Sequence, residues 1–133
     1  MVDFSDPHGH EATIPHSKPS IGPDDIRAVI ETLESGLIAG GSRVDLFERE
    51  IASYIGLRYA AATTSGTAAL FTLLSALNIG AGHEVVIPAY VCSSLIHAVR
   101  LTGAKPIIAD SGEDPFHMDA ASVSRVLTAM TKA

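Results

Sequence analysis

The chain has 133 residues, of which 47% are hydrophobic, and a formal net charge of −6 at pH 7. This length and composition suit one folded domain with an apolar core and argue against a disordered chain. The acidic balance and the lack of grouped lysines and arginines argue against nucleic acid binding. No apolar run is long enough to span a bilayer, and a single cysteine excludes an internal disulfide, so we expect a soluble cytoplasmic protein.

Residues 1–20 are rich in proline, histidine, serine and aspartate and show no hydrophobic periodicity, which predicts an extended arm. The arm contains histidines and acids of the types that bind metals, but their spacing matches no compact site. We therefore predict a solvated arm without a metal. The residues concerned are Asp6, His8, His10, Glu11 and His16.

Two amphipathic helices are predicted after the arm. The first begins at Pro23, because proline suits the first helical position, and it ends at Gly36. Its apolar residues recur at helical spacing. They are Ile26, Val29, Ile30 and Leu33. The second helix follows the loop at residues 37–42, has Ser42 as its expected cap and ends at Gly56.

The pattern changes after the second helix. Short apolar runs predict strands at residues 59–63, 85–88 and 106–109. The helical stretches between and after them are residues 67–79, 92–101 and 119–130. This βαβαβα order predicts an α/β fold, in which ligands bind at the carboxyl ends of parallel strands. Three strands leave a long apolar edge uncovered, so we expect a fragment of a larger fold.

The sequence TTSGTAAL, residues 63–70, joins the first predicted strand to the next helix. Gly66 lets a ligand approach the backbone, Ser65 and Thr67 offer hydroxyls, and the helix offers free amides and a positive dipole end. These features are typical of a phosphate site. The alternative, a turn capped by serine or threonine, fits the same residues. A P-loop and a dinucleotide loop are disfavoured because their spaced glycines are absent.

The sequence PAYVCSS, residues 88–94, follows the second predicted strand. Tyr90 is a candidate for stacking on a planar ring, and Cys92 is a candidate nucleophile. On one helix, Cys92 and His97 would point about 140° apart, so His97 would not serve as the base. We therefore interpret Cys92 as a small packed side chain and His97 as a partly buried, hydrogen-bonded one.

Several runs together resemble the amino-terminal third of the DegT/DnrJ/StrS-type aminotransferases, which use pyridoxal 5′-phosphate (PLP) on keto-sugars that are often nucleotide-linked. The runs are SKPSIGPDDIRAVIETLESGLIAGGSRVDLFEREIASYIG, TSGTAALFTLLSALNIGAGHEVVIPAY, AVRLTGAKPIIAD and FHMDAASV. The resemblance covers about residues 14–133. It implies the large domain of a fold type I enzyme, normally a homodimer with active sites at the subunit interface.

The resemblance also implies site residues. Ser65, Gly66 and Thr67 match the serine-glycine-threonine segment that holds the cofactor phosphate. The family usually has an aromatic residue, stacked on the pyridine ring, at the position of Cys92, so either Tyr90 compensates or the stacking is weaker. A further loop matches the substrate end of the pocket. It consists of Ile38, Ala39, Gly40 and Gly41.

The family's Schiff-base lysine, and the aspartate that pairs with the pyridine nitrogen, are expected beyond residue 133. Lys18, Lys105 and Lys132 do not match the lysine position, so we assign no catalytic residue and expect the chain alone to be inactive. We predict that residues 21–133 form a partial PLP-binding large domain, truncated before that lysine. The complete enzyme would bind a keto-sugar and an amino donor, as a homodimer or with the missing remainder.

Two alternatives stay open at the level of the sequence. In the first alternative, the chain is a noncatalytic module, such as a pseudogene product, that binds a phosphate or a partner. In the second alternative, it is a fragment of a related sugar dehydratase, in which histidine replaces the lysine.

Overall fold

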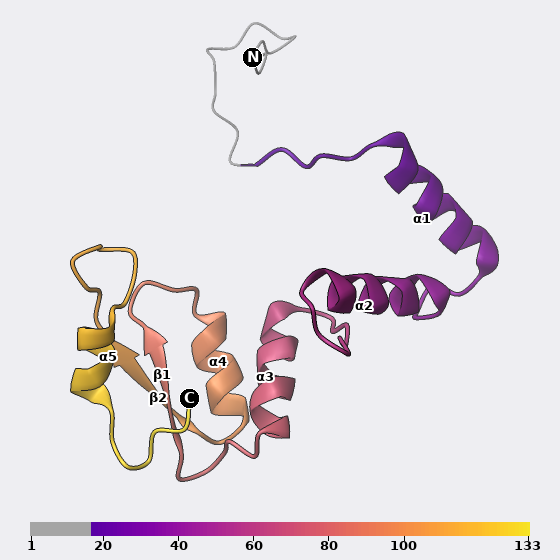
Figure 1. Cartoon of the computed structure of the whole chain (residues 1–133). Coiled ribbons are helices and arrows are strands. Elements are labelled where there is room, and N and C mark those ends of the chain that lie inside the picture. Colours follow the sequence, from indigo (N-terminus) through magenta and orange to yellow (C-terminus); the bar gives the residue numbers. More distant parts are fainter. Residues whose placement is uncertain (1–16) are drawn as a thin grey trace, which may run out of the picture. The chain divides into compact units, whose positions relative to one another are not determined.

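The structure is a computed structural model that describes residues 17–133 (Figure 1). The histidines and acids of the predicted arm lie outside the described residues, so the arm without a metal stays a prediction. The described residues divide into two compact units, one ending at Phe47 and one spanning Glu48–Ala133. Within residues 17–133, no helix is long and apolar enough to cross a membrane.

Helix α1, Pro23–Ser35, lies in the first unit and begins and ends as its sequence predicts. The Gly22 N–H donates to Asp25 Oδ2 at 2.7 Å, and Pro23 occupies the first helical position. At the other end, Gly36 has a φ of 72°, a left-handed conformation that glycine adopts without strain, and its N–H donates to the Leu33 carbonyl. No side chain of α1 is buried, so its apolar stripe is exposed.

Helix α2, Ser42–Tyr54, begins in the first unit and continues into the second. The prediction that Ser42 caps this helix is wrong, because Ser42 is its first helical residue and the Gly41 carbonyl accepts the first helical bonds, from the N–H groups of Val44 and Asp45. The helix ends before Gly56, as predicted. Gly56 has a φ of 73° and lets the chain turn away.

The second unit contains a two-stranded parallel sheet with helices before, between and after its strands. Strand β1, Glu84–Pro88, pairs with β2, Lys105–Ala109, in a register that aligns Glu84 with Lys105 and Pro88 with Ala109. Helix α4, Ser94–Leu101, connects the two strands, as a parallel pair requires. Helix α3, Gly66–Ala76, precedes β1, and helix α5, Ala120–Val126, follows β2.

The core of this unit forms where α3 and α4 pack together and α4 covers the strands. Figure 1 shows the strands between α4 on one side and α5 on the other. Apolar side chains from β1, from α3 and α4 and from the loops beside the strands meet in this layer and lose their contact with water. The buried residues are Leu74, Ile79, Val85, Ile87, Val99 and Ala104.

The predicted strand at residues 59–63 is wrong. These residues adopt no regular secondary structure, because no described strand runs beside them to complete a hydrogen-bonded ladder. The predicted helix at 119–130 is too long, since Leu127 is extended and ends it. The chain then returns to β1, where the Thr128 hydroxyl donates to Glu84 Oε2 at 2.6 Å and Thr131 forms a parallel bridge with Glu84.

Candidate functional site

The first turn of α3 is the centre of the candidate site. Ser65 is the N-cap: its backbone is extended, and its Oγ accepts a hydrogen bond from the Ala68 N–H at 3.1 Å. Its carbonyl accepts bonds from the Ala69 N–H at 2.9 Å and from the Thr63 hydroxyl at 3.0 Å. The capped turn, one of the two interpretations of TTSGTAAL, is therefore present.

The cap does not exclude an anion site, because it uses only part of the available donors. The N–H groups of Gly66 and Thr67 are at the start of the helix and have no acceptor within it. A Cβ placed on Gly66 would meet nothing within 4 Å, so the space beside this backbone is open. The first turn of α3 carries no acidic side chain, and its dipole end is positive. These residues fit a phosphate.

Figure 1 shows that four elements of the second unit each have one end on the same side of the unit. The carboxyl ends of β1 and β2 and the amino ends of α3 and α4 lie at the same end of this unit. The segments that contain Tyr90, Cys92 and Phe116 follow the two strands at this end. This is the edge at which parallel α/β sheets bind ligands.

Tyr90, directly after β1, is exposed and meets a second aromatic residue. Its ring contacts Phe116 edge to face, with ring centroids 5.4 Å apart and planes inclined by 64°. Phe116 lies in the segment that follows β2, so the two strand ends bring the rings together. Sequence reasoning did not identify Phe116 as a site residue, although an aromatic residue closely following a strand end was a usable signal.

Cys92 lies in the loop before α4, and the interpretation of it as a packed side chain is wrong. Helix α4 begins only at Ser94, so Cys92 is not on a packed helical face and is exposed. Its Sγ lies 2.7 Å from the Ser94 Oγ, and this hydrogen bond lowers the pKa of the Cys92 thiol. His97 is exposed rather than partly buried, and no hydrogen bond joins it to Cys92 in the described part of the chain.

The loop after β2 is held by a carboxylate. Asp114 accepts the Phe116 N–H at 2.9 Å and lies 2.8 Å from His117 Nδ1. The backbone bond from Phe116, followed by the bond from His117, lowers the pKa of Asp114. These contacts fix the backbone of Phe116 and thereby the position at which its ring meets Tyr90.

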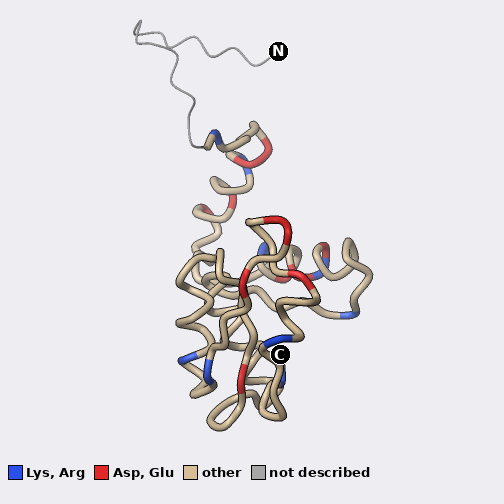
Figure 2. The backbone as a smooth tube through the Cα atoms, turned by 90° about the vertical axis from the view of Figure 1, so that its left-hand side faces the viewer, with Lys and Arg blue, Asp and Glu red and all other residues tan. Residues whose placement is uncertain are grey.

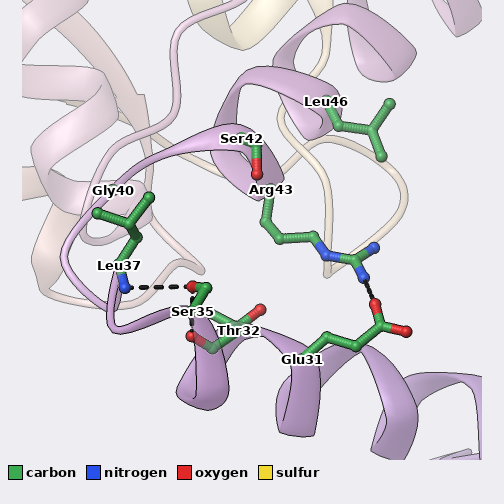
Figure 3. A pocket seen from close by; sticks show the side chains of 8 residues that line it. All are labelled: Glu31, Thr32, Ser35, Leu37, Gly40, Ser42, Arg43 and Leu46. Carbon is green, nitrogen blue, oxygen red and sulfur yellow. Dashed lines mark hydrogen bonds and ion pairs between the residues drawn. The ribbon is translucent and has the colours of Figure 1, made fainter.

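The predicted substrate loop, residues 38–41, lies between α1 and α2 in the first unit. Ile38 and Ala39 are exposed, and Gly40 lines a cavity of about 310 Å³. Figure 3 shows Arg43 and Glu31 pointing toward each other at this cavity, where they form an ion pair. Because the loop belongs to the first unit, its place beside the cofactor stays a prediction.

Other kinds of site find little support within residues 17–133. These residues contain no group of three or more histidine, cysteine, aspartate or glutamate side chains that could hold a metal ion. Figure 2 shows lysines and arginines scattered over several elements, with no basic stripe along the described chain. An anion at α3 would therefore depend mainly on backbone amides and hydroxyls.

The sequence pattern of the DegT/DnrJ/EryC1/StrS aminotransferase family matches residues 19–133. The chain belongs to this family. The spore coat polysaccharide biosynthesis protein SpsC of Bacillus subtilis (strain 168) is 41% identical to it over 120 residues, which are 90% of this chain and 31% of SpsC. The chain thus spans about a third of the length of this relative.

Solved structures of aminotransferases share the fold of this family member, which confirms the α/β prediction for a partial domain. The aminotransferase from Psychrobacter cryohalolentis is 35% identical, with a TM-score of 0.80 over 89% of this chain and 31% of that one. NtdA from Bacillus subtilis, with the cofactor PMP bound, is 32% identical, with a TM-score of 0.73 over 84% of this chain and 27% of that one.

Proposed function

We propose that this chain is the amino-terminal part of a PLP-dependent aminotransferase that acts on keto-sugars, and that it supplies the site for the cofactor phosphate. The observation that carries the proposal is the open, capped amino end of α3 at the ligand-binding edge of the sheet. Membership of the aminotransferase family and the relative with bound PMP support it.

The phosphate would be held by the first residues of α3. The N–H groups of Gly66 and Thr67 donate to its oxygens, and the hydroxyls of Ser65 and Thr67 add two further donors. The Ser65 Oγ accepts from Ala68, so its hydroxyl proton remains available for the phosphate. Bound in this way, PLP supplies an electron sink for chemistry at the substrate's amino carbon.

Tyr90 and Cys92 would contact the cofactor ring. Both are exposed after the carboxyl end of β1, and the edge contact with Phe116 limits the orientations that the Tyr90 ring adopts. A thiol offers less stacking area than an aromatic ring, so in this proposal Tyr90 supplies most of the apolar contact. Cys92 then contacts the ring face without acting as a nucleophile.

The lysine that joins the cofactor would come from residues outside this chain. Lys105 is the first residue of β2 and pairs with Glu84, which places it at the amino end of the sheet, opposite the candidate site. Lys132 also lies at that end, because its N–H donates to the Glu84 carbonyl. Lys18 belongs to the first unit.

The complete enzyme would be a cytoplasmic homodimer that binds its keto-sugar and amino donor partly through residues 38–41.

The test is a titration of the ¹⁵N-labelled chain with inorganic phosphate, followed by amide chemical shifts. We expect the largest shifts at Gly66 and Thr67. Gly66→Val should weaken binding at least about tenfold, because a side chain then occupies the space beside the backbone, where a Cβ atom meets nothing within 4 Å. Ala69→Val is the matched control, since it adds the same side chain further along the same helix at an exposed position. Shifts centred elsewhere, or equal losses in both variants, would refute the proposal.

A further inference from the structure

The segment that leads into the phosphate site, residues 59–64, has no strand partner in the part of the chain that the structure describes. Residues 59–64 adopt no regular secondary structure, and a segment of this kind has few contacts that fix its backbone. The direction in which it enters Ser65 nevertheless decides where the first amides of α3 point. A side-chain contact to this segment therefore bears on the geometry of the site.

Glu48 provides such a contact. Its Oε1 accepts a hydrogen bond from the Ala62 N–H at 2.8 Å, across fourteen residues of chain. A bond from a backbone N–H to a carboxylate is stronger than one between neutral groups. Glu48 is half-buried on α2 and belongs to the same unit as Ala62 and α3, so the bond joins two segments of one unit.

The contacts continue from Ala62 to the cap. Thr63, the next residue, donates its hydroxyl to the Ser65 carbonyl, and Ser65 in turn binds the Ala68 N–H. A hydrogen bond at Ala62 therefore lies only three residues from the cap that starts α3. Loss of that bond would release the segment just before the phosphate-binding amides.

We infer that Glu48 is a positioning residue of the phosphate site, which fixes the segment before Ser65 by binding the Ala62 N–H. The inference rests on the proposed function of Ser65, Gly66 and Thr67. Glu48 does not touch the phosphate. It acts by fixing the backbone that presents the donors.

Electrostatics and positioning predict opposite effects when Glu48 is replaced. Removal of a negative charge near an anion site should by itself strengthen phosphate binding. Loss of the positioning bond should weaken it, because the amides of Gly66 and Thr67 would have to be ordered when the phosphate binds. The sign of the change therefore separates the two effects.

The experiment compares three variants of the full 133-residue chain. Glu48→Ala removes the acceptor and the charge, whereas Glu48→Gln removes the charge and keeps an oxygen acceptor. Glu50→Ala is the matched control, because it removes the same charge from an exposed position on the same helix. Amide hydrogen exchange is measured without phosphate, and the affinity for inorganic phosphate is measured by NMR titration.

For Glu48→Ala we expect exchange at Ala62 and at the capped amides of Ala68 and Ala69 to accelerate and phosphate binding to weaken by about threefold to tenfold. Glu48→Gln should restore most of both, and Glu50→Ala should change neither in this direction. Unchanged exchange at Ala62, or equal or tighter phosphate binding by Glu48→Ala, would overturn the inference.

The same experiment tests the proposed function independently of the role of Glu48. If phosphate does not shift the Gly66 and Thr67 amides of the unaltered chain, the phosphate assignment is wrong and the inference falls with it. If it shifts them and Glu48→Ala behaves like the unaltered chain, the assignment stands and only the role of Glu48 is refuted.

Discussion

Ser65 has two roles in this structure, and a pair of substitutions separates them. As the N-cap of α3, it accepts the Ala68 N–H at 3.1 Å. As a member of the proposed phosphate site, it donates its hydroxyl proton to the ligand. Ser65→Ala removes both interactions, whereas Ser65→Asp keeps the cap, because aspartate is as good an N-cap as serine.

The expected magnitudes differ between the two substitutions. Ser65→Ala should lower the free energy of unfolding by about 1 kcal/mol, the usual cost of losing such a cap. It should also weaken phosphate binding severalfold, since one donor is lost. Ser65→Asp should leave the stability nearly unchanged. It should weaken phosphate binding at least about tenfold, because the introduced carboxylate would repel the anion at close range.

The assay combines urea unfolding, followed by circular dichroism, with phosphate titration by NMR. The control is Asp119→Ala, which removes the cap of a different helix, since Asp119 Oδ1 accepts the Ser122 N–H at 2.7 Å. This control should lose stability and keep its phosphate affinity. If Ser65→Asp bound phosphate as tightly as the unaltered chain, the ligand would not lie at α3 and the reasoning would be refuted.

Three further predictions concern the whole chain. The pKa of Glu84 lies below its ordinary value of 4.5, mainly because the Thr128 hydroxyl donates a hydrogen bond to its carboxylate. The ionised Glu84 therefore stabilises the fold above pH 4.5, and this stability is lost as the pH falls through the lowered pKa. Thr128→Val should flatten this acid dependence in melts between pH 3 and 6, and an unchanged profile would contradict it. The exposed stripe of α1 should make the chain self-associate in sedimentation experiments, and Val29→Glu should reduce this association; a sharp monomer peak for the unaltered chain would oppose the prediction. The chain alone should show no transaminase activity, and borohydride reduction with PLP should label no single lysine stoichiometrically; turnover with one labelled lysine would require a different active site.

The local parts of the fold could be predicted from the sequence because their causes are local. Pro23 and Gly36 delimit α1 through backbone preferences that act within a single turn. The runs at 85–88 and 106–109 became strands because α4 lets them pair in parallel. The run at 59–63 has a similar composition but no described partner, and no property of its own residues could reveal that.

In the candidate site, too, the features with local causes could be predicted and those that depend on tertiary structure could not. The capped, glycine-containing start of α3 follows from Ser65 and Gly66 themselves. The Tyr90–Phe116 contact and the Glu48–Ala62 bond join residues far apart in the chain, so they depend on tertiary structure that periodicity does not encode. The exposure of Cys92 was missed for a smaller reason, a helix that begins two residues later than its pattern indicates.

The bridge between Glu84 and Thr131 has a consequence for the order of events during synthesis. On one side β1 pairs with β2, which follows it closely, but the bridge on the other side is made by Thr131, which follows α5 in the chain. Until Thr131 has left the ribosome, the described residues offer the backbone of β1 no partner on that side. Nascent copies of the protein would be exposed to misassembly through this edge during that interval.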